Sequence, residues 1–524
     1  MIWFAYIIVI ITLGYYYFTR TYNYWKKLGV NQTNPLPIVG DMLPILTQKM
    51  AISQVIQNIY FQFPNARYSG MYSFTSRSLL IRDPELIKQL LVKDFDHFLD
   101  HTPFIDAEGD PFWGNNLFAM RGQRWKELRP KISPAFTSSK MKHMFSLMVE
   151  ASKQFIQYFE SQDKNFISLE MKDAYTRLAN DVIASCVFGL KVDSLSDKDN
   201  DFYVIGKQLT NFSGFWKTVK VFSYLFIPLI PKYLKFGMFS PEEVAFLRKV
   251  VRDTIALRER EGIIRPDLIQ ILMNFRKENI PEESNKDAVD TGFATVQEVE
   301  ATVTSKKDLT DDEIVAQAGG FFFAGFDSVS GLMCFTSYEL ALNQDCQDKL
   351  RAEIQKTLEE CNGNLTYEGL MKIKYMDMII SETLRKWPNG AATDRICTKP
   401  YTINPQTPNE KPIHLKIGDS ITIPICAIQM DPQYFPNPDK FDPERFSDEN
   451  KNKIVPYTFL PFGAGPRGCI ASRFAIMEVK TMLFHLLSQF KIVATDKTEI
   501  PIQIAPTAAG LNAKNGFWLG LQRL

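Results

Sequence analysis

A single cysteine in a loop rich in glycine and proline constrains this chain more than any other feature. The loop spans residues 461–471, reads PFGAGPRGCIA and contains Cys469. After it, apolar residues recur with a helical period from Ile470 to about Phe490, which predicts a long buried helix. The sulfur therefore lies just before a helix N-terminus, where unpaired N–H groups and the helix dipole favour thiolate over thiol. The glycines let the backbone approach closely on one side, as a flat, bulky ligand requires.

The residues around Cys469 separate three interpretations of its thiol. Zinc needs four clustered ligands, and the chain has no C-x-x-C pair, so a zinc site is disfavoured. One thiolate is enough for a haem, because the porphyrin supplies the four in-plane ligands. A lone cysteine can also be an ordinary small buried residue. Phe462, Gly465, Arg467 and Cys469 fit the pattern F-x-x-G-x-R-x-C, and four specified positions rarely coincide by chance.

This pattern resembles the haem-ligating loop of the cytochromes P-450. The resemblance implies haem b (iron protoporphyrin IX) as cofactor, Cys469 as the axial ligand of its iron, and Phe462 and Gly465 as parts of the haem-binding loop. Arg467 matches a position that binds a haem propionate. The family usually has glycine two residues after the cysteine, where this chain has Ala471. We expect the added methyl group to crowd the helix start slightly without removing a chemical group.

Two further sets of residues gain a role from the same resemblance. Trp125 and Arg129 lie four apart on one face of a predicted helix. Alone, such a pair is usually a packed tryptophan beside a surface charge. The resemblance implies that both, together with Arg395, bind the haem propionates.

A buried charge network is the second set. Glu382 and Arg385 are three apart on a helix predicted from Met371 to Trp387, and Arg445 follows in a proline-bounded loop. The spacing alone carries little information, since any long helix can contain it. The resemblance implies that the three charges brace the haem loop, where their value lies more in fixing geometry than in stability.

An almost uncharged helix is predicted from about Leu309 to Leu342, with Thr310 as its cap, and its apolar character places it inside the protein. Asp327 and Ser328 lie in its middle, where an acid and a hydroxyl must be satisfied or functional. Local hydrogen bonding to the backbone is the ordinary explanation. The resemblance implies instead an oxygen-binding groove beside the haem, where this pair helps to deliver protons. Serine replaces the usual threonine, so the hydroxyl is kept but its rotamer is less fixed.

The first residues predict a membrane anchor. Residues 2–18 are apolar and uncharged, near the minimum length for crossing a bilayer, and basic residues follow, beginning with Arg20. A cleaved signal peptide is disfavoured, because the basic N-terminal region is missing and tyrosines stand where a small-residue cleavage site should be. We expect an anchor over 1–20, a basic, proline-rich hinge over 21–50, and a single haem-binding domain over 51–524.

Composition excludes several classes of protein. The 524 residues have 45% hydrophobic content and a net charge of +1, which suits a large globular enzyme and gives no reason to expect nucleic acid as a partner. The seven cysteines are scattered and odd in number, which favours a reducing compartment over a disulfide framework.

The resemblance covers nearly the whole chain and implies a mainly α fold with smaller β-sheets (α+β). The haem then lies between the long central helix and the helix after Cys469. Stretches such as RGQRWKELRPKISPAFTSSKM and FAGFDSVSGLMCFTSYELALN resemble insect microsomal members. That group is associated with the oxidation of plant toxins, insecticides and other lipophilic xenobiotics.

The implied activity is that of a monooxygenase on the endoplasmic reticulum membrane, facing the cytoplasm. It inserts one atom of O2 into a lipophilic small molecule. The chain shows no dinucleotide-binding fingerprint, so the electrons of NADPH must come through a separate NADPH-cytochrome P-450 reductase, with cytochrome b5 as a second candidate partner. The alternatives are oxidation of an endogenous lipid or hormone, a reductase-independent haem-thiolate isomerase or dehydratase, and a non-catalytic haem protein. The pair Asp327 and Ser328 argues against the isomerase.

Substrate access is expected at two segments, residues 101–120 and 212–230. The apolar run from Val221 to Pro231 within the second can be a core segment or a patch that dips into the bilayer. Seven residues are expected to line the pocket, each with a core-packing alternative: Phe104, Phe118, Phe322, Ala324, Ala391, Ala392 and Leu511.

Overall fold

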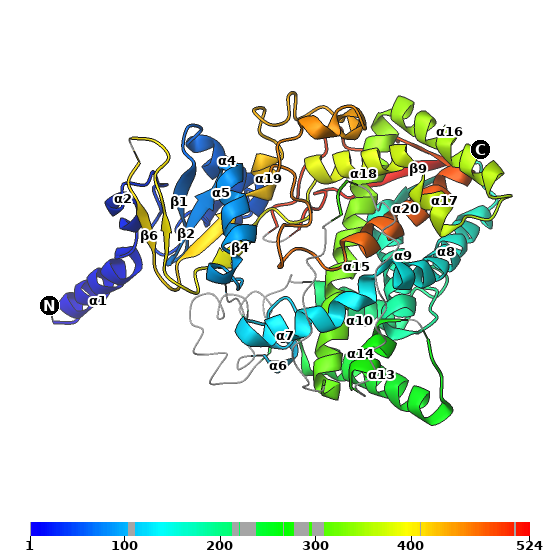
Figure 1. Ribbon diagram of the computed structural model, residues 1–524, viewed down its shortest axis with the longest axis horizontal. Coiled ribbons are helices and arrows are strands. Elements are labelled where there is room, and N and C mark those ends of the chain that lie inside the picture. Colours follow the sequence, from blue (N-terminus) through cyan, green and yellow to red (C-terminus); the bar gives the residue numbers. More distant parts are fainter. Residues whose placement is uncertain are drawn as a thin grey trace.

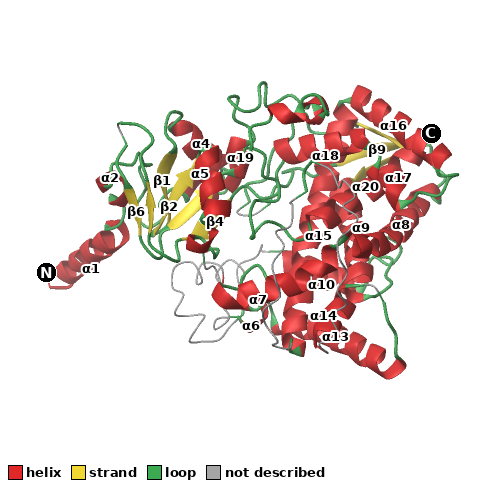
Figure 2. Cartoon of the chain, in the orientation of Figure 1, coloured by secondary structure: helices red, strands yellow, loops and turns green. Residues whose placement is uncertain are grey.

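The computed structural model describes residues 2–102, 110–211, 220, 237–265, 267–276, 293–295, 309–408, 410–507 and 510–524. A small sheet lies on one side of the molecule and a larger assembly of helices on the other (Figure 1). Helices predominate over strands, as the cartoon coloured by secondary structure makes clear (Figure 2). The predicted mainly α architecture with smaller sheets is confirmed.

The helices differ widely in length. The longer ones are α1 (Ile2–Thr19), α4 (Ile52–Gln62), α7 (Gly122–Ile132), α8 (Ser138–Glu160), α9 (Met171–Ile183), α10 (Asp201–Thr210), α13 (Pro241–Glu261), α15 (Asp311–Leu342), α16 (Gln344–Glu360), α18 (Lys374–Lys386) and α20 (Ser472–Gln489). The shorter ones are α2 (Tyr24–Lys27), α3 (Leu43–Leu46), α5 (Pro84–Lys88), α6 (Pro111–Gly114), α14 (Leu268–Arg276), α17 (Tyr367–Met371) and α19 (Ile425–Ile428). Two π-helical turns are η1 (Gln89–Lys93) and η4 (Ala184–Phe188), and the 3-10 turns are η2 (Phe95–His97), η3 (Ser133–Phe136), η5 (Pro443–Phe446) and η6 (Lys451–Lys453).

The strands form three small sheets. The largest has the order β1 (Tyr68–Ser73), β2 (Ser76–Ile81), β7 (Ser420–Ile423) and β4 (Thr393–Ile396), with β2 and β7 parallel. A second contains β3 (Phe166–Glu170), β9 (Trp518–Arg523) and β8 (Phe490–Val493), and the third pairs β5 (Tyr401–Ile403) with β6 (Ile413–Leu415). The first sheet joins strands more than 300 residues apart in sequence, since Leu79 is paired with Ile421.

Helix α15 is the central element of the helical side. Its start has the predicted cap, because Thr310 and Glu313 bond reciprocally in a capping box. Glycine inside it is explained by close neighbours. A Cβ on Gly319 would overlap the ring of Phe112, so α6 can approach α15 only at a glycine. Within the described residues α15 is the one helix long and apolar enough by itself to cross a membrane, but 61% of its apolar window is buried inside the protein. Ile8–Thr19, the part of α1 whose side chains are described without a gap, is a shorter apolar helix.

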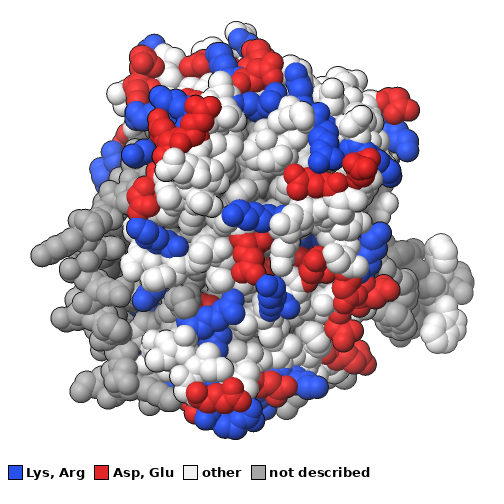
Figure 3. Space-filling model, turned by 90° about the vertical axis from the view of Figure 1, so that its right-hand side faces the viewer, with Lys and Arg blue, Asp and Glu red and all other residues white. Residues whose placement is uncertain are grey.

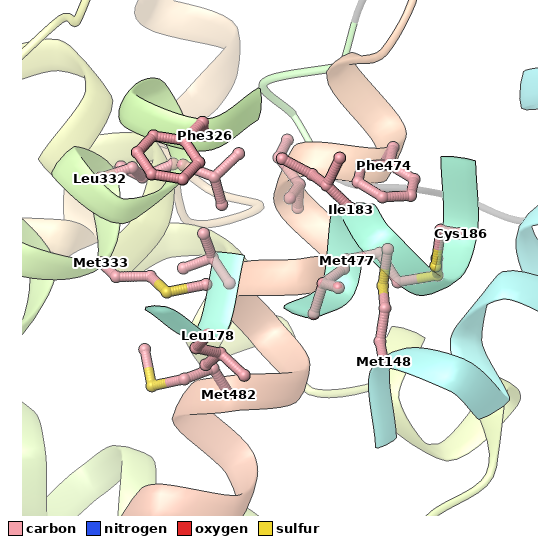
Figure 4. Close-up of a cluster of buried hydrophobic side chains, with 14 of the residues drawn as sticks. Met148, Leu178, Ile183, Cys186, Phe326, Leu332, Met333, Phe474, Met477 and Met482 are labelled. Carbon is pink, nitrogen blue, oxygen red and sulfur yellow. The ribbon is translucent and has the colours of Figure 1, made fainter. Parts of the chain in front are cut away.

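Helix α20 is the long buried helix predicted after Cys469, and it packs against α8 and α15. Figure 4 shows apolar side chains from α8, α9, η4, α15 and α20 converging in one cluster. The labelled members are Met148, Leu178, Ile183, Cys186, Phe326, Leu332, Met333, Phe474, Met477 and Met482. This cluster ties α15 to the helix that follows the cysteine loop, and so fixes two sides of the region expected to hold the haem.

Residues 21–50, where we expect a hinge, pack against the first sheet. Tyr22, Trp25, Val30 and Met42 are buried in the sheet-side core. By contrast, the described side chains of α1 are mostly exposed; Trp3, for example, is 83% exposed. The segment predicted to be an anchor is therefore a helix that extends from a firmly packed base (Figure 1).

Candidate active site

The loop before Cys469 is held by glycines in the left-handed region. Gly463 and Gly465 have φ of 72° and 71°, and the Cys469 N–H donates to the Phe462 carbonyl at 2.9 Å. A Cβ on Gly465 would overlap the Leu91 carbonyl of η1. At Gly465 it is therefore η1 that lies close to the backbone of the loop. The sequence analysis had attributed this close approach to a flat ligand.

Ala471 does not disturb the helix start. It is the N-cap of α20 with φ of −102°, a conformation open to any L-residue. Glycine is therefore not required at position 471. The methyl group of Ala471, which we expected to crowd the helix start, does not come with a strained backbone.

The side chain of Cys469 is accessible although protein surrounds it. The residue is exposed, yet desolvation by the surrounding protein raises the pKa of its thiol. The sulfur is therefore open to a ligand. The Ala471 N–H and the charge of Arg129 lower the pKa, as expected at a helix start, but desolvation outweighs them. A metal ion bound to the sulfur would reverse this balance, because a coordinating thiol is deprotonated.

Three arginines gather beside this loop. Burial lowers the pKa of Arg467 to about 9, and repulsion from Arg395 and Arg129 contributes to the lower value. Arg395 is 1% exposed, and burial lowers its pKa to about 10. Among the described residues, no hydrogen-bond partner reaches its Nε. Desolvated cations with an unused donor require an anion, and a haem carries two carboxylates.

The side chain of Arg467 is engaged with the segment before α7. Its Nε donates to the Leu99 carbonyl at 2.9 Å, and its Nη2 donates to the Met120 carbonyl at 2.7 Å and to Asp100 at 3.1 Å. Its guanidinium lies 4.1 Å from the ring centre of the buried Trp125. The structure therefore places Arg467 against Trp125. Arg467 also hydrogen-bonds to the segment before α7 and lies near Arg395 and Arg129.

His101 is a residue of this region that the sequence did not single out as a site residue. Its Nδ1 lies 3.0 Å from Asp394 Oδ1 and 3.5 Å from Arg395 Nη1, and its ring stacks on Phe118 at 4.7 Å. Burial is the largest cause that lowers the pKa of His101. No spacing rule connects positions 101 and 394, so only the fold reveals this contact.

Helix α15 has an accessible small residue near its middle. Ala324 is exposed, whereas Phe322 and Phe326, two residues before and after it and on another face of the helix, are buried. Ser328 donates its hydroxyl to the Ala324 carbonyl at 2.5 Å, and Asn389 donates to the Ser328 carbonyl. The hydroxyl is therefore satisfied by its own helix, the ordinary arrangement for a serine inside a helix.

Asp327 is held by a lysine from α9. Lys172 Nζ lies 2.7 Å from Asp327 Oδ1, and it also donates to the Asp327 carbonyl at 3.1 Å and to Ser330 at 3.0 Å. The Asp327 side chain is 45% exposed. This carboxylate is both fixed in position and accessible to water, which are the properties that a proton carrier needs.

The three charges predicted to form a network are in contact. Arg385 binds Glu382 through two bonds of 2.7 and 2.9 Å, with both side chains fully buried. Arg445 approaches the same carboxylate at 3.4 Å, and the Asp442 N–H donates to it at 2.9 Å. Arg385 also donates to the carbonyls of the segment leading to η5, including Pro438 at 2.6 Å. The network joins α18 to the chain that leads into the cysteine loop.

The residues expected to line a pocket divide into three groups. Phe118 is 62% exposed, Ala324 is exposed, and Ala391 and Ala392 are partly exposed. Phe322 and Leu511 are buried members of the main core. This is the core-packing alternative to a pocket-lining position. Phe104, the segment 212–230 apart from Lys220, and the whole apolar run from Val221 to Pro231 lie outside the described residues.

Comparison with known proteins gives one consistent result. The family model described as Cytochrome P450 matches residues 31–519. The chain is 43% identical to cytochrome P450 9e2 of Blattella germanica, over 99% of this chain and 98% of that protein. It is 37% identical to probable cytochrome P450 9f2 of Drosophila melanogaster, over 99% of both chains. It is also 37% identical to cytochrome P450 6k1 of Blattella germanica, over 97% of this chain and 94% of that protein.

Proposed function

The chain belongs to the cytochrome P450 family, whose members are haem-dependent monooxygenases, and from this premise we propose that it oxidises lipophilic small molecules at a membrane. The proposed substrates are xenobiotics such as plant toxins or insecticides. The proposed cofactor is haem b. Electrons come from NADPH through a separate reductase, and cytochrome b5 is a second candidate donor.

The observation that carries the proposal is that the accessible sulfur of Cys469 lies near Arg129, in a cluster of arginines that includes the buried Arg395, whose Nε is unused. Cys469 supplies the thiolate ligand, and Arg395 and Arg129 supply positive charge for the propionates. The ring of Trp125 packs against the Arg467 guanidinium and holds it in position. Phe462 and Gly465 shape the loop. When bound, the haem supplies the one-electron and oxygen chemistry that side chains cannot perform.

The chain's own part in the reaction is to exclude water, orient the substrate and move protons. Ala324 leaves room along α15, and the Ser328 hydroxyl lies one turn further on. Ser328 can release the Ala324 carbonyl and donate its proton toward the open side of the helix. Asp327, held by Lys172 and reachable by water, can then take a proton from water and pass it to the serine oxygen.

Attachment to the endoplasmic reticulum by α1, with the body facing the cytoplasm, is part of the same proposal. The 18 residues of α1 span about 27 Å as a helix, close to the thickness of a bilayer core. On the face of the body shown in Figure 3, acidic and basic side chains are interspersed. That mixture gives no reason to propose a nucleic acid as partner.

The test is the absorption of the reduced, carbon monoxide-bound protein. Cys469→Ser should abolish the long-wavelength band that requires a thiolate opposite the gas, whereas Cys361→Ser, at a half-buried free cysteine, should keep it. An unchanged band in Cys469→Ser would place the ligand elsewhere. Reductase-supported turnover of a panel of lipophilic compounds then tests the substrate class. Conversion of a lipid hydroperoxide without NADPH would favour the isomerase instead.

A further inference from the structure

The loop that follows α18 runs along the middle of α15. Trp387 stacks on Phe335 of α15, with ring centres 4.7 Å apart and ring planes inclined by 13°. Two residues further on, the side-chain amide of Asn389 donates a hydrogen bond to the backbone carbonyl of Ser328. Because Phe335 and Ser328 lie about two helical turns apart, the loop follows α15 toward the N-terminal end of that helix.

The carbonyl of Ser328 accepts this bond in addition to its place in the helix. A carbonyl oxygen has two lone pairs, and the helical hydrogen bond uses only one of them. The carbonyl of the preceding residue, Asp327, is reached in the same way by Lys172 Nζ of α9 at 3.1 Å. Two consecutive carbonyls of α15 therefore each receive a donor from another element of the fold.

Gly331 leaves the space that these two donors occupy. In a helix, a side chain at position 331 covers the turn that contains residues 327 and 328. A Cβ at this position would lie 3.1 Å from Asn389 Oδ1 and 3.8 Å from Lys172 Nζ. A side chain here would crowd the Asn389 amide, so the contact with Asn389 explains why a glycine stands inside the helix.

The two residues held in this way are those proposed to move protons. The carboxylate of Asp327 lies 2.7 Å from Lys172 Nζ, so the lysine holds both the side chain and the carbonyl of this residue. Ser328 donates its hydroxyl to the Ala324 carbonyl at 2.5 Å. A serine hydroxyl is carried on a single methylene group, so its position depends on the backbone that Asn389 holds.

The same loop forms part of the expected pocket wall. Ala391 and Ala392 are partly exposed and pack against the sheet-side core. The Ala391 carbonyl accepts a hydrogen bond from the Cys426 N–H at 2.9 Å. Trp387, by contrast, packs against the main core on the helical side. Asn389 therefore lies between the two cores, in the stretch that joins the pocket wall to α15.

We propose that Asn389 is a positioning residue for proton delivery: it holds the Ser328 carbonyl, so that the Ser328 hydroxyl keeps a fixed position relative to the pocket wall. The inference rests on the proposed function, in which this hydroxyl donates protons. A substrate that lies against Ala391 and Ala392 is then aligned with the proton path by the same loop. Without the amide bond the hydroxyl is kept but its position is not, so more of the oxygen consumed is released as hydrogen peroxide.

The test is a double-mutant cycle in the full-length, haem-loaded protein, supplied with NADPH and a separate reductase. The substrate is the compound that the wild type converts fastest, from a lipophilic panel that includes fluorogenic alkoxycoumarins. Asn389→Leu removes the donor at about the same side-chain size, and it is made alone and together with Ser328→Ala. Asn343→Leu is the matched control, because the Asn343 amide also donates to a carbonyl of α15, that of Glu339 at 2.8 Å, at the far end of the helix.

The expected result is a severalfold lower ratio of product formed to NADPH consumed in Asn389→Leu, and an unchanged ratio in Asn343→Leu. In the Ser328→Ala background, Asn389→Leu should cause no further fall, because both changes act on one hydroxyl. Hydrogen exchange at the backbone amides of residues 324–335 should also be severalfold faster in Asn389→Leu than in the wild type. The carbon monoxide band shows that each variant is folded, and Asn389→Ala takes the place of Asn389→Leu if the latter lacks the band.

An unchanged ratio in the Asn389 variant overturns the inference and leaves the proposed function intact. Equal fractional falls with and without the Ser328 hydroxyl do the same, since Asn389 would then act by another route. A wild-type ratio in Ser328→Ala removes the hydroxyl from the mechanism, and the inference with it, while the monooxygenase activity stands. Absence of NADPH-dependent turnover in the wild type overturns the proposed function itself, together with the inference.

Discussion

At the scale of single residues, the arginines beside Cys469 are the most informative feature of the site. Burial is the largest cause of the lowered pKa of Arg467. Asp100 opposes it, and repulsion from Arg395 and Arg129 adds to it. Such a cluster is unfavourable in the protein alone, because burial removes hydration from like charges and Arg395 keeps an unused Nε. It becomes favourable once a dianionic ligand binds.

Replacement of Arg395 by methionine separates these two effects. Arg395→Met removes a buried cation whose Nε is unused, so the haem-free protein should be as stable as the wild type or more stable. Haem retention should fall by about tenfold to a hundredfold, since a charge-assisted hydrogen bond contributes roughly 1.5–3 kcal/mol. The measurements are thermal unfolding of the haem-free form and the haem-to-protein ratio after dialysis. Undiminished haem retention would exclude Arg395 as a propionate partner.

A pair of substitutions tests whether the hydroxyl of Ser328 takes part in proton delivery. Ser328→Ala should lower the ratio of product formed to NADPH consumed severalfold and release the difference as hydrogen peroxide, because a donor in the proton path is lost. Ser328→Thr keeps the hydroxyl and should keep the ratio. Both variants should show the carbon monoxide band. A ratio that does not change in Ser328→Ala would remove this hydroxyl from the mechanism.

At the scale of secondary-structure elements, the sequence predicted what is local. The cap at Thr310 and the helix after Cys469 both depend on neighbours in sequence, and both are present. The helix predicted from Met371 begins three residues later, at Lys374, because α17 ends at Met371. Boundaries of this kind are decided by packing that a local pattern does not contain.

Contacts between distant elements were beyond the reach of the sequence. The pairing of Lys172 with Asp327, and of His101 with Asp394, joins residues more than 150 positions apart. The glycine pattern marked Gly465 as special, but only the fold shows that η1 is what approaches it. Motif spacing therefore identified the candidate site residues. The charged partners of these residues, such as Lys172 beside Asp327, were revealed only by the three-dimensional arrangement.

Gly465→Ala measures how strongly η1 and the cysteine loop depend on each other. At φ of 71° an L-residue is strained, and the added Cβ would overlap the Leu91 carbonyl, so we expect a loss of stability of about 2–4 kcal/mol and lower haem content. Gly363→Ala is the matched control, because Gly363 has φ of 75° but open space around it. It should cost only about 1 kcal/mol. Equal losses in chemical denaturation would mean that backbone strain alone explains the glycine.

At the scale of the whole molecule, the chain divides between a packed body and an exposed helix. The described side chains of α1 contribute little to either hydrophobic core, whereas the chain from Tyr22 onward is part of the sheet-side core. The body should therefore fold without α1, and its haem site lies in elements far along the chain from it. Attachment and catalysis are then separable properties of one protein.

Deletion of residues 2–20 tests this separation. The shortened protein should keep the carbon monoxide band and the haem-to-protein ratio of the full chain, since the deletion ends before the buried Tyr22. Its binding to vesicles should fall strongly, because the deletion removes the apolar helix proposed as the anchor. Loss of haem on deletion would show that α1 supports the fold of the body, and unchanged binding would show that attachment depends on other surfaces.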